Sequence, residues 1–169
     1  MRYSVSMKKK IVYIDLDDTI ANFKGDPKLG NNDDFRQMYE PGFFLSLKPV
    51  AGALVAVRKI IAMGYDVQIL SQPVAESAHS YSEKVQWVCL HFPELYNKIN
   101  LTQDKGLFKG DYLVDDNPVK WQNKFEANGG RFVHFPYNHG DPNRQSNAYM
   151  WECLVEFFKG ELENDNEKD

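Results

Sequence analysis

The feature that most constrains this chain is an apolar run that ends in a cluster of acids. Residues 11 to 20 read Ile-Val-Tyr-Ile-Asp-Leu-Asp-Asp-Thr-Ile, and a lysine cluster precedes them. A short run rich in β-branched and aromatic residues is typical of a buried strand in a sheet that is covered on both faces. Carboxylates at the edge of such a strand are costly unless cations or hydrogen-bond donors meet them. We therefore expect positive charge at this end of the strand.

The spacing of the acids indicates which of them act together. Because side chains alternate along an extended chain, Asp15 and Asp17 are expected to point to one side, while Asp18 turns away. Two converging carboxylates at the carboxyl end of a strand form a hard-oxygen site suited to Mg²⁺. The same residues also fit a strand followed by an ordinary Asp-rich turn. Taken alone, the stretch favours neither interpretation.

Length and composition indicate a single globular domain. The chain has 169 residues, of which 43% are hydrophobic and 26% charged, close to average globular usage. We expect one domain over residues 1–160 and a polar, disordered tail over residues 161–169. The net charge is −4, with a single basic cluster at residues 8–10, so no nucleic-acid polymer is expected as a partner.

The sequence also bears on location and thiol chemistry. It contains no stretch long enough to span a membrane and begins without the pattern of a secretory signal, so a cytoplasmic protein with no membrane partner is expected. Cys89 and Cys153 have no metal-type spacing to histidines and are expected to be buried free thiols. A monomer and a homodimer both remain open.

The rest of the chain predicts alternating strands and helices. Residues 21–48 form a long irregular insertion, expected to be a small cap with one short helix over residues 33–39. Helices are predicted over residues 49–63, 81–92, 119–127 and 148–158, and strands over residues 65–70, 98–101, 112–114 and 131–135. This order favours a three-layer, Rossmann-like α/β fold with a parallel sheet. Ligands of such sheets bind beyond the carboxyl ends of the strands.

Polar residues mark several of these strand ends. Ser71 follows the second strand, Asp115 and Asp116 end a later one, and Lys105 lies in the loop that leads to it. Each of them alone also fits a turn or surface residue. Their common placement with Asp15 and Asp17 at the carboxyl edge of the sheet indicates one shared ligand-binding site.

This set, in this order, resembles the four motifs of the haloacid dehalogenase superfamily of phosphotransferases. The resemblance implies that Asp15 attacks phosphorus and forms an aspartyl-phosphate, and that Asp17 is the general acid and base. Ser71 and Lys105 would bind phosphate oxygens, and the Thr19 hydroxyl would support the loop by hydrogen bonding. It further implies Mg²⁺ held by Asp15, the Asp17 backbone carbonyl, and the Asp115 and Asp116 pair, with the order within that pair left open.

Further segments resemble the 5′(3′)-deoxyribonucleotidase family within that superfamily. These are residues 41–44 with 47–53, residues 81–88 and residues 105–116. The resemblance implies Mg²⁺-dependent removal of phosphate from deoxyribonucleoside monophosphates, with a preference for uracil and thymine. Lys84 would be a second phosphate contact, and Phe43 and Phe44 would form an apolar wall near the base. The two phenylalanines equally fit core packing, and Lys84 equally fits a surface helix residue.

The chain departs from this family at a few positions, and other functions compete with it. Gln72 and the pair Asn117-Pro118 differ from the residues that the family often has there, which leaves base and sugar preference open. A dehalogenase needs neither Asp17 nor Asp116, and a signalling receiver domain needs an acceptor aspartate where Ser71 ends the second strand. A phosphatase of another small metabolite and a non-catalytic nucleotide-binding relative remain as alternatives.

Overall fold

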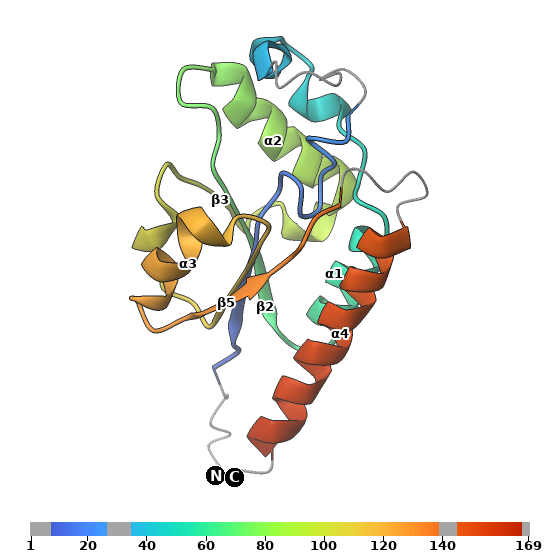
Figure 1. Cartoon of the computed structure of the whole chain (residues 1–169), viewed down its shortest axis with the longest axis vertical. Helices are drawn as coiled ribbons and strands as arrows, with labels where there is room; N and C mark the ends of the chain where they lie inside the picture. The colour runs from blue at the N-terminus through green and yellow to red at the C-terminus, as the bar shows by residue number, and fades with distance from the viewer. Residues whose placement is uncertain (1–7, 27–34, 139–144, 167–169) are drawn as a thin grey trace, which may run out of the picture.

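A five-stranded parallel sheet forms the centre of the computed structural model, which describes residues 8–26, 35–138 and 145–166 (Figure 1). The strand order is β3-β2-β1-β4-β5, so the first strand lies in the middle. The strands are β1 (Ile11–Ile14), β2 (Asp66–Ser71), β3 (Ile99–Leu101), β4 (Tyr112–Asp115) and β5 (Arg131–His134). This architecture confirms the predicted α/β fold with a parallel sheet.

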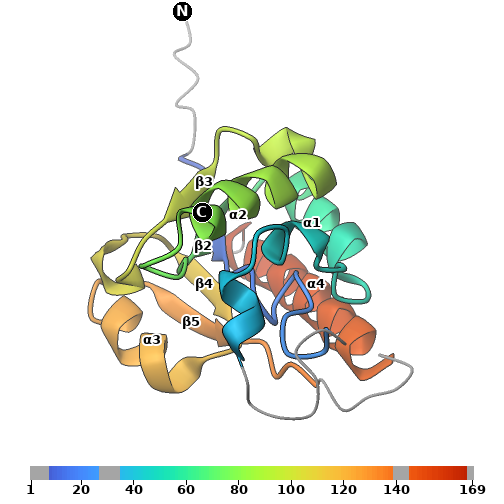
Figure 2. The same cartoon turned by 90° about the horizontal axis from the view of Figure 1, so that it is seen from above.

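Helices cover both faces of the sheet (Figure 2). The helices α1 (Ala53–Ala62) and α4 (Gln145–Asn166) pack together on one face, and α2 (Ala78–His91) contributes to the same apolar core. The helix α3 (Pro118–Glu126) covers the opposite face. Alternation along β1 serves both layers, because Val12 and Ile14 belong to the first core and Tyr13 to the second. Both faces of the central strand are therefore buried, as its apolar run predicts.

The predicted helices are confirmed, with shifted boundaries. α2 begins at Ala78, because the side chain of Ser77 accepts a hydrogen bond from the Ser80 backbone N–H at 3.3 Å and caps the helix. Residues 78–80 were expected to be loop and belong to this first turn instead. α1 starts at Ala53 rather than at residue 49, and Gly64 follows its end with a left-handed φ of 101°, as glycine often does after a helix.

The last helix is longer than the sequence predicts. α4 continues to Asn166, so the prediction of a disordered tail is wrong for residues 161–166, while residues 167–169 lie outside the described ranges. The Tyr112 hydroxyl donates to Glu161 Oε2 at 2.7 Å, and Arg131 Nη1 lies 3.2 Å from Glu161 Oε1. This polar stretch is tied to the sheet through its side chains, which composition alone does not reveal.

The helices also bear on the predictions for the two cysteines and for membrane spans. Both cysteines are free thiols, but Cys89 is exposed and Cys153 half-buried, so the prediction that they are buried is wrong. Within the described residues, no helix combines the length and the apolar character that crossing a bilayer requires.

The described part of the cap lies over the carboxyl ends of the strands. It contains the short 3₁₀ helices η2 (Phe35–Tyr39) and η3 (Phe44–Ser46), which pack against α2 at the top of Figure 1. The helix predicted over residues 33–39 is thus confirmed from Phe35 onward, and residues 33 and 34 lie outside the described ranges. This position places cap side chains beside the strand ends that carry the acids.

Candidate active site

The acidic stretch after β1 is a tight loop. The backbone N–H groups of Ile20 and Ala21 both donate to the Leu16 carbonyl, at 2.9 and 2.8 Å, and Asp18 has a left-handed φ of 56°. The strand was expected to end at Asp15 and Asp17, and it ends at Ile14, because the chain folds back on itself directly after the first acid. The Asp18 carboxylate accepts hydrogen bonds from the backbone N–H groups of Phe23 and Lys24. Alternation predicted that it would turn away from the other acids, but it lies near Asp116, because Lys24 Nζ is 3.5 Å from Asp18 Oδ2 and 3.7 Å from Asp116 Oδ2.

A buried ammonium joins the two acidic strand ends. Lys105 Nζ lies 2.5 Å from Asp15 Oδ1 and 2.6 Å from Asp115 Oδ2, and its side chain is only 2% exposed. Burial lowers the pKa of Lys105, but the charges of Asp15 and Asp115 outweigh burial and leave the pKa above its ordinary value. Lys105 is therefore cationic in the folded protein and fixes the separation of the two carboxylates.

A second buried ammonium lies at the end of β2. Lys84, on α2, is fully buried, pairs with Asp17 Oδ2 and donates to Ser71 Oγ at 3.1 Å. Burial raises the pKa of Asp17, and the Lys84 charge only partly counters this effect. Within the described ranges, Asp17 Oδ1 has no hydrogen-bond partner. Asp17 thus combines a raised pKa with a free oxygen atom that can carry a proton.

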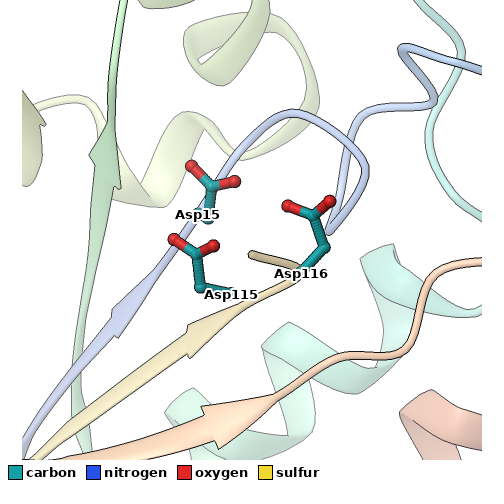
Figure 3. Close-up of side chains that lie close together, drawn as sticks. All are labelled: Asp15, Asp115 and Asp116. Atoms are coloured by element: carbon teal, nitrogen blue, oxygen red, sulfur yellow. The ribbon is translucent and has the colours of Figure 1, made fainter. Parts of the chain in front are cut away.

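Three carboxylates gather where β1 and β4 end. One oxygen atom from each of Asp15, Asp115 and Asp116 can be chosen so that all three lie within 4.8 Å of one another (Figure 3). Asp115 is already bound on both oxygens, by Lys105 and by the Asn117 backbone N–H at 2.8 Å. Asp116 has a looser ion pair, with Lys24 at 3.7 Å. Asp116 therefore has the more available oxygens of the pair.

The charge of this cluster indicates what it can bind. Burial and the nearby charge of Asp15 raise the pKa values of Asp115 and Asp116 each to about 7. When Asp15, Asp17, Asp115 and Asp116 are all ionised, these four carboxylates exceed the two buried ammoniums by two negative charges. A divalent cation would balance this excess, and carboxylate oxygens are the ligands that Mg²⁺ and Ca²⁺ prefer. The residues present thus fit a hard divalent metal.

A cleft of about 380 Å³ opens beside Asp17. Phe23 and Phe44 line one part of it, with ring centroids 6.0 Å apart and nearly parallel planes. Phe43 does not line this cleft, and its ring packs edge-on against Phe44, with centroids 5.1 Å apart. Both rings are buried, so the lining of the cleft and not exposure distinguishes them. Of the two phenylalanines predicted to face a base, the structure therefore places Phe44 at the cleft and Phe43 in the cap core.

The other residues predicted for the site come together at the carboxyl edge of the sheet, with one change of role. The Thr19 hydroxyl has no hydrogen-bond partner among the described residues, whereas its carbonyl accepts from Trp151 Nε1 at 3.2 Å. The expected support of the loop by that hydroxyl is not present. Phe23 was missed, because an isolated aromatic residue in a loop carries no sequence signal of contact with a site.

The fold of this chain is that of the haloacid dehalogenase-like hydrolases. Its structure is similar to that of a haloacid dehalogenase-like family hydrolase from Xanthomonas campestris, with a TM-score of 0.56 and 14% identity, over 92% of this chain and 98% of the other. At this identity the likeness concerns the fold alone.

Sequence comparison then assigns the family. The model of the family described as 5′ nucleotidase, deoxy (pyrimidine), cytosolic type C matches residues 31–152, so the chain belongs to this family. The human 5′(3′)-deoxyribonucleotidase of cytosolic type is 41% identical over 87 residues, which are 50% of this chain and 43% of the relative. A protein of Bordetella bronchiseptica is 44% identical over 80 residues, which are 47% of this chain and 43% of the relative. The chain thus matches less than half the length of these relatives.

Proposed function

We propose that this chain is a Mg²⁺-dependent phosphomonoesterase that hydrolyses deoxyribonucleoside 5′- or 3′-monophosphates. The observation that carries the proposal is the buried Lys105 between Asp15 and Asp115, next to the Asp17 carboxyl and the aromatic cleft. These groups match the needs of a phosphate ester of a nucleoside, because one end requires positive charge and the other an apolar, stacking surface. Family membership supports the same substrate class.

The residues take these roles in the proposed reaction. The Asp15 carboxylate attacks phosphorus in line and forms an aspartyl-phosphate, while Asp17 protonates the leaving alkoxide. Asp17 then accepts a proton from the water that hydrolyses the intermediate. The raised pKa of Asp17 supports the first of these roles, because a carboxyl group must hold a proton near neutral pH to act as an acid.

Phosphate binding falls to Lys84, Lys105 and Ser71. Each ammonium has three N–H donors, and the contacts of Lys84 and Lys105 with protein oxygens use two of them. One donor of each lysine is left for a phosphate oxygen. The Ser71 hydroxyl accepts from Lys84, so its own hydrogen is available as a further donor.

The metal would be held by Asp15, Asp116 and the backbone carbonyl of Asp17, with Asp115 contributing directly or through water. Bound Mg²⁺ would neutralise charge on the phosphate and so reduce its repulsion of the Asp15 carboxylate. The occupied oxygens of Asp115 support Asp116 as the direct ligand of the pair.

Location and assembly belong to the same proposal. We propose that the enzyme acts in the cytoplasm, which agrees with the cytosolic type of the human relative. Its partner is the small nucleotide itself, and the described residues give no reason to prefer a monomer over a homodimer.

Phosphate release from paired deoxy- and ribonucleoside monophosphates tests the function. We expect Mg²⁺-dependent release from the deoxy compounds, loss of release with EDTA, and no release by Asp15→Asn. Glu156→Gln, which changes an exposed carboxylate on α4, serves as the matched control and should retain wild-type rates. Release from a small alkyl phosphate but from no nucleotide would refute nucleotides as the substrate class and support the phosphomonoesterase reaction. Absence of Mg²⁺-dependent release from every ester would refute the proposal.

A further inference from the structure

One buried carboxylate beside the site has no part in the chemistry described above. Glu83, on α2, is 6% exposed, and its carboxylate accepts hydrogen bonds from backbone N–H groups of the cap. Its Oε1 accepts from the Gly42 N–H at 2.5 Å, and its Oε2 accepts from the Phe44 N–H at 3.0 Å and, more weakly, from the Leu45 N–H at 3.4 Å. Burial of a carboxylate is costly unless donors compensate it, and here the cap provides those donors.

The segment that Glu83 binds carries the aromatic wall of the cleft. The Phe44 ring lies over the Lys84 ammonium, with Nζ 4.7 Å from the ring centroid, and stacks on Phe23. Glu83 and Lys84 are neighbours in sequence, yet one side chain holds the cap and the other reaches Asp17 and Ser71. A single turn of α2 thus fixes the phosphate-binding end and the apolar end of the cleft relative to each other.

The other ring of the wall is held in a similar way. The Phe23 backbone N–H donates to Asp18 Oδ1 at 3.0 Å, and Asp18 is also buried. Each stacked ring therefore has its own backbone N–H bound by a buried carboxylate that is adjacent in sequence to a site residue, Asp17 or Lys84. This arrangement holds the wall through its backbone, and both residues line the cleft.

A contact one turn further along α2 provides a comparison. Trp87 Nε1 donates to the Leu47 carbonyl at 2.8 Å, and thus also joins α2 to the end of the cap. Neither Trp87 nor Leu47 lines the cleft. Loss of the Trp87 hydrogen bond would loosen the cap without acting directly on the Phe44 backbone.

We propose that Glu83 is a positioning residue that determines substrate selection, by holding Phe44 at a fixed distance from the phosphate-binding Lys84. The inference rests on the proposed nucleotidase function, because it assigns the wall to the nucleoside part of the substrate. A substrate that consists of little more than phosphate does not reach the wall and is indifferent to its position. Glu83 therefore discriminates nucleotides from small phosphate esters without touching either.

The decisive variants are Glu83→Gln and Glu83→Asp. Glutamine has the same shape but presents an amide N–H₂ group to backbone N–H donors, so one end of the clamp is lost. Loss of a hydrogen bond to a charged group weakens the hold on the Phe44 backbone, and with it the contact between the wall and the nucleoside. We therefore expect KM for deoxyuridine monophosphate to rise roughly tenfold, with kcat nearly unchanged. KM and kcat for glycerol 2-phosphate should remain at their wild-type values. Glu83→Asp retains the charge and should recover part of the nucleotide KM.

Equilibrium binding separates this inference from the proposed function. In an Asp15→Asn background, Glu83→Gln should weaken binding of deoxyuridine monophosphate roughly tenfold and leave binding of inorganic phosphate unchanged. Trp87→Phe is the control for a generally loosened cap and should leave the ratio of the two affinities unaltered. If the wild type binds the nucleotide but hydrolyses none, the proposed function fails, and this ratio still decides the role of Glu83.

Several results would overturn the inference. One is an equal loss of nucleotide and phosphate affinity in a Glu83→Gln protein that melts at the wild-type temperature, because the clamp would then act on the whole site. Another is an unchanged ratio in both Glu83 variants. A third is the absence of nucleotide binding by any of these proteins, which would refute the proposed function as well.

Discussion

Replacement of Asp116 by asparagine should stabilise the protein in the absence of divalent metal. Asp116 is partly buried beside Asp15 and Asp18, and burial together with those charges raises its pKa from the ordinary 3.8 to about 7. A pKa difference of one corresponds to about 1.4 kcal/mol, so the ionised carboxylate costs the metal-free fold up to roughly 4 kcal/mol above pH 7. Asparagine has nearly the same shape and carries no charge, so it removes this cost.

The sign of the pH dependence follows from the same pKa values. The unfolded chain loses the Asp116 proton near pH 3.8 and the folded chain near pH 7, so the folded state holds more protons between these values. The stability of the wild type therefore falls as pH rises through this window. The advantage of Asp116→Asn is largest at pH 8 and shrinks toward pH 4.

Thermal denaturation in EDTA measures the effect. For a chain of this size 1 kcal/mol shifts Tm by about 2–4 °C, and with partial relief by solvent we expect Asp116→Asn to melt roughly 5–10 °C above the wild type at pH 8. Added Mg²⁺ should raise the Tm of the wild type and have little effect on the variant. Glu156→Gln should match the wild type throughout. If Asp116→Asn melts at or below the wild-type Tm in EDTA at pH 8, the repulsion argued for this cluster is refuted.

Three further substitutions test the framework of the site. Lys105→Met leaves two buried carboxylates facing each other and should cost about 3–5 kcal/mol of unfolding free energy in urea with EDTA; a cost below about 1 kcal/mol would contradict the buried ion pairs. Ser77→Ala removes the N-cap hydrogen bond of α2 and should cost about 1 kcal/mol of unfolding free energy, while Ser77→Asp should retain most of the stability. Equal stability of the wild type and both variants would contradict the N-cap role of Ser77. Glu161→Ala removes the acceptor for Tyr112 and should cost about 1–3 kcal/mol, measured by the same denaturation; no loss would mean that the end of α4 is frayed in solution.

The central sheet and the site residues at its edge could be predicted because both depend on local pattern. Strands buried on both faces read as short apolar runs, and the residue that follows such a run lies at the ligand-binding edge of a parallel sheet. The placement of Ser71 after one run and of Asp115 after another follows from this rule alone. Lys105 lies in a loop, and only its order among the other motifs identified it.

The features that could not be predicted depend on contacts between distant segments. Glu83 has the sequence context of a surface helix residue and is buried only because the cap covers that part of α2. Residues 161–166 have a composition typical of disorder, but Glu161 is bound by two side chains of the sheet. The position of Phe43 behind Phe44 likewise depends on how the cap folds back, which two adjacent phenylalanines do not specify.

The clamp formed by Glu83 recognises main-chain groups, and this has a consequence for how the cap can change. Every residue except proline provides a backbone N–H, so the hydrogen bonds from positions 44 and 45 to Glu83 do not depend on which side chains stand there. Gly42 is the exception, because its φ of 85° is rarely adopted by other residues. Under the proposed role of Glu83, exchange of the Phe44 ring would therefore change the wall of the cleft and keep the hydrogen bond that holds its backbone.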